Sequence, residues 1–245
     1  MRHIPLLLLA IAPAAVLFLF FYLRDRYRKE PLGQLAVTFL LGAIVLLPSF
    51  AMSRALQSLT GWSPRTPNLL HALLGALLIV GLVEESWKFL VVRWYAYAQP
   101  EFDEPYDGIL YSIAAALGFA TLENIIYVFY GGFDIGVMRA FLAVPAHAFD
   151  GVLMGYFLGE AKFARSERHA LWLNFLALAT AVLAHGIYDF IVFTLNRRPL
   201  MLVNLLVYAA LAWVIFFEAT RHQAEKSPFR DPLLVQSRTP NRFPD

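Results

Sequence analysis

The sequence predicts an all-α, polytopic integral membrane protein with about seven transmembrane helices. Of its 245 residues, 59% are hydrophobic and 16% are charged, and the mean hydropathy is +0.58. An ordinary soluble domain has about 45–50% apolar and about 25% charged residues. The apolar residues also gather in runs of about 20 or more, which is the length of helix that crosses a bilayer. No run shows the alternating pattern of a transmembrane β-strand.

Seven apolar runs follow one another, and polar or charged connections separate them. The first run ends at the basic stretch Arg24-Asp-Arg26-Tyr-Arg28-Lys29, as a membrane helix ends at the headgroups. Several runs exceed the thickness of the hydrocarbon core, so we expect tilted helices or helices that extend beyond it. The expected spans are Ile4–Leu23, Gly33–Met52, Asn68–Tyr97, Asp107–Tyr130, Gly136–Lys162, Ala170–Leu195 and Leu200–Ala219.

The distribution of Lys and Arg over the connections predicts the orientation. The first, third and fifth connections and the C-terminal tail hold 13 such residues, whereas the opposite side holds six, Arg139 among them. Cytoplasmic loops are enriched in Lys and Arg. We therefore expect a multi-pass protein of the cell membrane with its N-terminus outside and its C-terminus in the cytoplasm.

Residues 1–220 are expected to form a single transmembrane helical domain, in which residues 68–195 provide the helices of the candidate site. Residues 221–245 contain four prolines and no long apolar period, which predicts a disordered cytoplasmic tail. The formal net charge is only +2, and the basic residues lie in short clusters beside apolar runs. This pattern indicates the lipid bilayer as a partner and argues against nucleic acid. The sequence does not predict an oligomeric state.

The stretch Gly81-Leu-Val-Glu84-Glu85-Ser-Trp-Lys88 puts three ionisable residues inside the third apolar run. A charge near the middle of a membrane helix costs roughly 2.5–3.5 kcal/mol on insertion scales, so each needs a partner, a water-filled cavity or a function. Glu84 and Lys88 are four residues apart, which predicts an ion pair on one helix face. Glu85 points about 100° away from Glu84 and is expected to find its partner on another helix.

The fourth and sixth runs each contain an ionisable residue on a defined helix face. Phe119, Glu123 and Tyr127 follow one another at steps of four residues, so they line one face near the middle of the bilayer. His185 and Asp189 have the same spacing. A carboxylate one turn from an imidazole can hold it in one tautomer, a supporting role common at catalytic and metal sites.

The fifth run contains His147, with Gly151 and Gly155 on the same face. Glycines at this spacing allow a neighbouring helix to approach closely. Asp150 lies one turn from His147, and we expect it to orient the His147 ring. Pro145 is expected to loosen the helix just before the histidine.

Four helices thus each bring a Glu or His to similar depth, which predicts one shared site. Carboxylates and imidazoles without a thiolate suit a metal such as zinc with an open position for water. They also suit a metal-free site in which a desolvated Glu is the general base and histidines stabilise an oxyanion. Either arrangement activates water for hydrolysis. The chain has no Cys, no His-Glu-x-x-His, no Gly-x-Ser-x-Gly and no Gly-x-Gly-Asp, so other protease classes lack support.

The ordered set of motifs resembles the PrsW family of intramembrane proteases, which is related to the CAAX-prenyl and bacteriocin-processing membrane proteases. The resemblance spans residues 81–190. It implies a bacterial inner-membrane enzyme that cleaves a membrane-anchored protein, typified by an anti-sigma factor cut at its extracytoplasmic side. The motifs are Glu84-Glu85-x-x-Lys88, Phe119-x-x-x-Glu123, His147-x-x-x-Gly151 and His185-x-x-x-Asp189.

The resemblance implies a functional set with distinct expected roles. Glu85 or Glu84 is expected to deprotonate the attacking water. A metal, with zinc as the candidate, would be held by His147, His185 and Glu123, and in the metal-free alternative the histidines stabilise the oxyanion. The expected catalytic residues are Glu84, Glu85, Glu123, His147 and His185, and the expected supporting residues are Lys88, Asp150 and Asp189.

Two other classes of function fit the same residues. A proton-coupled transporter would use the Glu and His side chains as a relay, although transporters usually contain an inverted repeat and none is visible here. A catalytically silent scaffold would bind membrane partners and tolerate exchange of Glu for Gln.

Overall fold

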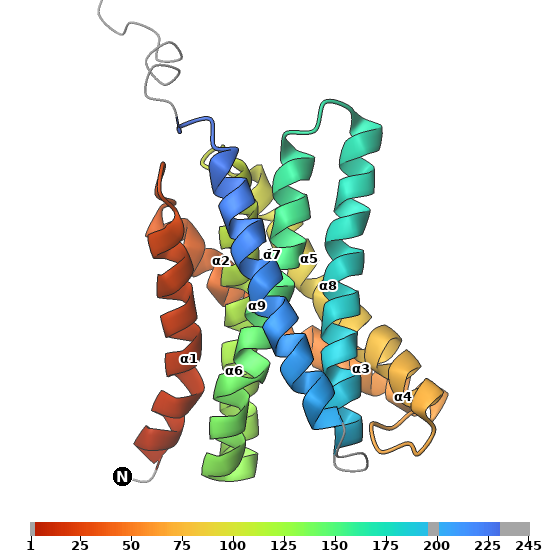
Figure 1. The fold of residues 1–245 in the computed structure, drawn as a ribbon. Helices are drawn as coiled ribbons and strands as arrows, with labels where there is room; N and C mark the ends of the chain where they lie inside the picture. Colours follow the sequence, from red (N-terminus) through yellow and green to blue (C-terminus); the bar gives the residue numbers. More distant parts are fainter. Residues whose placement is uncertain (1–2, 196–200, 231–245) are drawn as a thin grey trace, which may run out of the picture.

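The computed structural model describes residues 3–195 and 201–230, and within these residues it is a bundle of helices without a β-strand (Figure 1). The all-α prediction is confirmed. The elements are α1 (His3–Arg24), α2 (Leu32–Ile44), α3 (Leu46–Thr60), α4 (Leu69–Gly75), the π-helical η1 (Ala76–Gly81), α5 (Leu82–Trp94), the 3₁₀ turn η2 (Ala96–Ala98), α6 (Pro105–Phe141), α7 (Ala143–Lys162), α8 (Glu167–Leu195) and α9 (Met201–Glu225).

In the described part of the chain, six stretches of helix are long and apolar enough to cross a membrane. One of them, Pro105–Lys162, has 58 residues, or ~87 Å of helix, far more than one crossing needs. It reverses at Gly132, whose φ of 77° is left-handed. Glu123 and Arg139 on its two legs are in contact, which shows that the legs are antiparallel. Counted by legs, the described residues of this multi-pass membrane protein contain seven helical segments long enough to cross a membrane, the number that the sequence predicts.

The first leg of α6 is the centre of the bundle. Nearly every residue from Pro105 to Thr121 is buried, as expected for a helix that is apolar on all sides. Helix α7 packs closely along it because glycines face each other: a Cβ on Gly155 would collide with the carbonyl oxygen of Gly108. The predicted close approach at the glycines of the fifth span is therefore confirmed.

Three local breaks change the directions of helices in the bundle. Pro48 cannot donate to the carbonyl of residue 44, and α2 gives way to α3 at Val45. Pro145 likewise separates α6 from α7 at Leu142, just before His147, as expected. In η1 the i→i+5 pattern adds a residue to the turn and changes which face of α5 meets the bundle.

The two described termini lie at opposite ends of the bundle (Figure 1). We call the end with His3 and Gly132 the N-terminal end, and the end with Glu225 the C-terminal end. Helix α9 continues to Glu225, past residue 220 where the sequence analysis places the start of the tail. Residues 231–245 of that expected tail lie outside the described residues, as do Arg197 and Arg198. Which end faces the cytoplasm stays a prediction from the charge distribution.

Candidate active site

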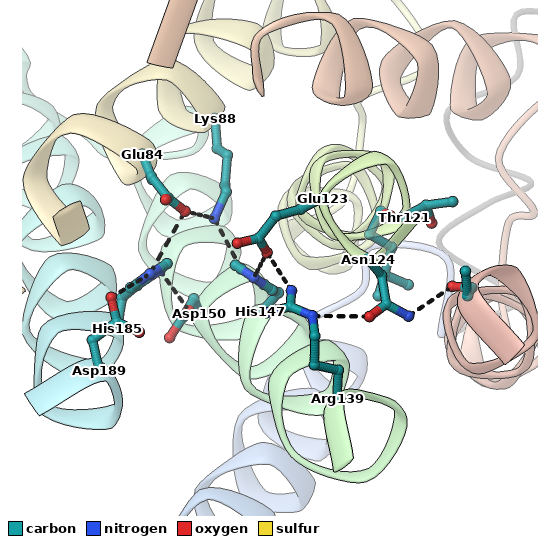
Figure 2. A network of polar contacts seen from close by, with 12 residues as sticks. Glu84, Lys88, Thr121, Glu123, Asn124, Arg139, His147, Asp150, His185 and Asp189 are labelled. Atoms are coloured by element: carbon teal, nitrogen blue, oxygen red, sulfur yellow. Dashed lines mark hydrogen bonds and ion pairs between the residues drawn. The ribbon is translucent and has the colours of Figure 1, made fainter. Parts of the chain in front are cut away.

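Helices α5, α6, α7 and α8 bring the five expected catalytic residues into one network of polar contacts (Figure 2). The three supporting residues belong to it as well. Its contacts run from Glu84 and Asp189 at one side to Glu123 at the other, with Lys88 and His185 between them. The structure thus brings these residues together in one place, as the sequence predicts. Gly81, the last residue of η1, has no side chain, and an added Cβ would lie only 3.2 Å from the Val182 carbonyl oxygen of α8, so α8 packs closely beside the start of α5.

Glu85 and Lys88 form the buried centre of this network. Oε1 of Glu85 lies 2.7 Å from Nζ of Lys88 and 2.7 Å from Nδ1 of His185. Glu84 lies farther from Lys88, with 3.8 Å between Oε2 and Nζ. The predicted Glu84–Lys88 pair exists, but Glu85 is the closer partner of Lys88 because residues three apart also share a helix face. Glu85 has the interhelical partner that the sequence requires, and it is His185.

The His147 ring contacts a cation on one side and a carboxylate on the other. Nδ1 lies 3.1 Å from Nζ of Lys88, and Nε2 lies 3.0 Å from Oε2 of Glu123. A lysine ammonium has donors only and a carboxylate accepts, so the two contacts together favour a lone pair on Nδ1 and a hydrogen on Nε2. The Lys88 ammonium also lies over the ring of Phe119, with Nζ 4.3 Å from the ring centroid.

Asp150 contacts a different histidine from the one expected. Its Oδ2 lies 3.3 Å from Nδ1 of His185, whereas Asp189 lies 3.5 Å from Nε2 of the same ring. The expectation that Asp150 orients His147 is corrected, because the α7 face that carries Asp150 turns toward α8. The expected support of His185 by Asp189 agrees with the structure. Four carboxylates, counting Glu84 and Glu85, surround the His185 imidazole.

Two side chains of the network were not among the sequence-predicted site residues. Arg139, assigned above to an outer loop, is inside the bundle with Nη2 2.6 Å from Oε2 of Glu123. Its Nε donates to Oδ1 of Asn124 at 2.9 Å, and Nδ2 of Asn124 donates to the carbonyl of Ala10 in α1 at 3.0 Å. The one signal for Arg139 was the pair Gly131-Gly132, which allows the chain to reverse between Glu123 and the arginine.

Four ligand-type side chains meet closely enough to hold a metal ion. One ligand atom from each of Glu85, His147, Asp150 and His185 lies within 4.8 Å of the others, and all four residues are buried. Oε2 of Glu85 and Oδ1 of Asp150 are buried without a hydrogen-bond partner, so both have lone pairs for a cation. This mixed imidazole and carboxylate set fits a zinc-type ion.

The structure therefore groups Asp150 with the two histidines, and it does not place Glu123 among these four. Glu123 is instead the partner of Arg139 and His147. The positive charge now nearest to the four residues is that of Lys88, which contacts Glu85 and His147 directly.

The members of the network differ in their exposure. The Glu85 and Lys88 side chains are 0% and 1% exposed, whereas those of Glu84, Glu123 and Asp189 are 14–16% exposed. Water and a substrate can therefore reach Glu84 more readily than its neighbour Glu85.

The network lies nearer to the N-terminal end of the bundle. Glu123 is 18 residues from the start of α6, or ~27 Å, but only nine residues from the reversal at Gly132, or ~14 Å. His185 has a similar position in α8, ~27 Å from Glu167 and ~15 Å from Leu195. Exposed aromatic side chains around the reversal, such as Tyr130 and Phe133, are typical of a membrane interface.

Comparisons with known proteins identify related sequences. The sequence model of the family described as PrsW family intramembrane metalloprotease matches residues 30–218. The chain is 38% identical to protease PrsW of Geobacillus kaustophilus, over 76% of this chain and 79% of that protein. It is 37% identical to protease PrsW of Halalkalibacterium halodurans, over 81% and 91%, and 36% identical to that of Bacillus subtilis, over 81% and 87%. No solved structure gives a significant match.

Proposed function

The chain belongs to the PrsW family of intramembrane proteases, and on that premise we propose that it hydrolyses a membrane-anchored protein with a water activated by Glu84. The observation that supports this choice of base is the contrast between two adjacent carboxylates. Glu85 is fully buried and engaged by Lys88 and His185. Glu84 is 14% exposed, and its Oε2 lies farther from both groups, 3.8 Å from Nζ of Lys88 and 3.6 Å from Nε2 of His185.

In the proposed reaction, Glu84 takes a proton from water while the water oxygen bonds to the carbonyl carbon of the scissile peptide. The proton then passes to the amide nitrogen as the C–N bond breaks, and the products are a carboxylate and an amine. A carboxylate can serve as base and then as acid in this way if it lies within hydrogen-bond reach of both groups.

His185 is the proposed donor to the oxyanion that forms on the carbonyl oxygen. Its Nδ1 faces Glu85 and Asp150, both acceptors, so Nδ1 is the protonated nitrogen toward the interior. Its Nε2 faces the partly exposed side, between the carboxylates of Glu84 at 3.6 Å and Asp189 at 3.5 Å. With acceptors at both nitrogens, the ring carries a hydrogen on Nε2 as well and can donate from that side. A donor fixed in this position stabilises the charge that develops in the transition state.

Glu85, His147, Asp150 and His185 are the residues that would hold a metal ion, which would take the place of a hydrogen on the His185 ring. A bound zinc-type ion supplies Lewis acidity and makes a bound water acidic enough to react near neutral pH. Glu85 and Asp150 also have a role that needs no metal: their carboxylates orient the His185 ring.

The depth of the network supports a cut near the outer face of the membrane. It lies closer to the N-terminal end, which the Lys and Arg distribution assigns to the outside. A substrate of this enzyme is then a protein anchored in the membrane by an apolar helix, with the scissile bond near the outer end of that helix. An anti-sigma factor is the substrate type that the family resemblance implies.

The experiment that tests this function is a comparison of membrane proteins in cells with the wild-type chain and with Glu84→Gln. New protein N-termini are identified by mass spectrometry after brief induction. The proposal predicts at least one new N-terminus, in or beside a membrane helix, that appears only with the wild type. An identical set of N-termini in both strains contradicts it, and a proton flux that depends on Glu84 in proteoliposomes would favour the transporter.

A further inference from the structure

We propose that Arg139 is a positioning residue, which acts through Glu123 to hold His147 in one tautomer and one orientation. The inference deepens the proposed function and rests on it for the meaning of His147. Arg139 is not part of the sequence motifs, and it enters the site only because α6 reverses at Gly132.

The guanidinium of Arg139 is fixed by three different contacts. Nη2 is 2.6 Å from Oε2 of Glu123, Nε donates to Oδ1 of Asn124 at 2.9 Å, and the group lies 4.1 Å above the Tyr127 ring. A planar guanidinium held through two of its nitrogens has little rotational freedom. The guanidinium is therefore held in one orientation beside Glu123.

Asn124 anchors this arrangement to the first helix. It is fully buried, and its Nδ2 donates to the backbone carbonyl of Ala10 at 3.0 Å. Because Nδ2 is occupied by that carbonyl, the Asn124 Oδ1 faces Arg139 as an acceptor. Figure 2 shows the chain of contacts from α1 through Asn124 to Arg139.

Arg139 and His147 share one oxygen atom of Glu123. Oε2 is 2.6 Å from Nη2 of Arg139 and 3.0 Å from Nε2 of His147. The charged arginine keeps this carboxylate in place as an acceptor, so the imidazole hydrogen is drawn to Nε2. The Nδ1 lone pair then points toward Lys88 and the buried centre of the site. Without Arg139, the carboxylate can rotate away and the ring can flip.

The test uses the full-length protein in lipid nanodiscs, with ¹⁵N-labelled histidine and the variants Arg139→Gln, Arg139→Lys and Arg54→Gln. Arg54 is an exposed arginine on α3 whose guanidinium donates to Gln57, and it serves as the matched control. The imidazole nitrogens of His147 are assigned by their absence from a His147→Ala sample. Their chemical shifts report which nitrogen carries the hydrogen, and no substrate is needed.

The proposal expects a protonated Nε2 and a non-protonated Nδ1 on His147 in the wild type and in Arg54→Gln. Arg139→Gln is expected to show exchange between the two tautomers, and turnover of a cleaved substrate falls about 10–100-fold through kcat with KM unchanged. Arg139→Lys, which keeps a cation beside Glu123, is expected to restore the wild-type tautomer and part of kcat.

Wild-type histidine signals and wild-type kcat in Arg139→Gln would overturn the proposal. If that variant does not fold, Arg139→Lys decides, since the opposite tautomer in a folded Lys variant would also overturn it. The spectra separate a failure of the Arg139 proposal from a failure of the proposed function. Cleavage by Glu84→Gln would refute Glu84 as the base, while the His147 tautomer would still report on Arg139.

Discussion

Oε1 of Glu85 lies 2.7 Å from Nδ1 of His185, although 100 residues separate the two in the chain. The contact joins α5 to α8 in the buried interior of the bundle. The same oxygen accepts from Lys88, so one carboxylate fixes a cation on its own helix and an imidazole on another. The stability of the site and its chemistry therefore depend on the same atoms.

Replacing Lys88 with Met is expected to destabilise the protein, because Glu85 would keep a buried charge without its closest cation. Removing one partner of a buried pair typically costs about 3–5 kcal/mol. Thermal unfolding in detergent, with Lys226→Met as the exposed control, measures the difference. A melting temperature equal to that of Lys226→Met would show that Lys88 does not compensate the buried charge.

Metal content distinguishes the ligand group in the structure from the one expected from the sequence. We expect purified protein to bind about one zinc-type ion per chain and to lose it in His147→Ala, His185→Ala and Asp150→Asn. Glu123→Gln is expected to retain it, since Glu123 is not among the four residues that meet. Loss of metal in Glu123→Gln with retention in Asp150→Asn would favour the sequence-based set.

Because α7 packs so closely on α6, one added methyl group is expected to lower the stability of the protein strongly. Gly155→Ala would put a Cβ against the Gly108 carbonyl, and neither backbone can move away easily. Overpacking of this kind typically costs about 1–3 kcal/mol. Gly33→Ala in α2 is the control, because no atom lies within 4 Å of the added Cβ. Equal thermal stability of the two variants would contradict the described packing.

Two buried carboxyl groups at the C-terminal end of the bundle are expected to make the free energy of unfolding fall as the pH rises. Burial raises the pKa of Glu104 from its ordinary value of 4.5 to about 7, and burial raises the pKa of Glu30 to about 7 as well. Between these values the folded state binds more protons than the unfolded state, so the free energy of unfolding decreases with increasing pH. The loss begins above pH ~4.5 and is complete above pH ~7.

Glu104→Gln tests this pH dependence, since glutamine can still accept from Ser227 but does not titrate. The melting temperature of the variant is expected to fall less than that of the wild type between pH 4.5 and 7.5. Glu167→Gln, at an exposed position, is the control. An identical pH profile for Glu104→Gln and the wild type would contradict the prediction.

Much of the fold follows from the sequence because the bilayer fixes the length of an apolar helix. The expected spans match the helices within a few residues, except at two C-terminal ends: α3 continues to Thr60 and α9 continues to Glu225. The positions of Glu85, His147 and His185 near mid-depth also predict a shared site, because buried charge in a membrane needs partners.

The sequence could not define how each helix is rotated about its axis. Asp150 turns to His185 because of the way α7 packs on α6 and α8, which no spacing along α7 reveals. Arg139 reaches Glu123 only because the chain reverses at Gly132 and not several residues later. The π-helical η1 similarly changes the face that α5 presents, and its apolar residues resemble any other helical run.

The most direct test of the central claim is a cleavage assay with purified protein in liposomes and an identified membrane-anchored substrate. The rate with Glu84→Gln is compared with that of Glu218→Gln, which removes an exposed carboxylate from α9. Loss of the general base is expected to lower kcat about 10²–10⁴-fold, whereas Glu218→Gln retains the wild-type rate. Cleavage by Glu84→Gln at the wild-type rate would contradict the assignment of Glu84 as the base.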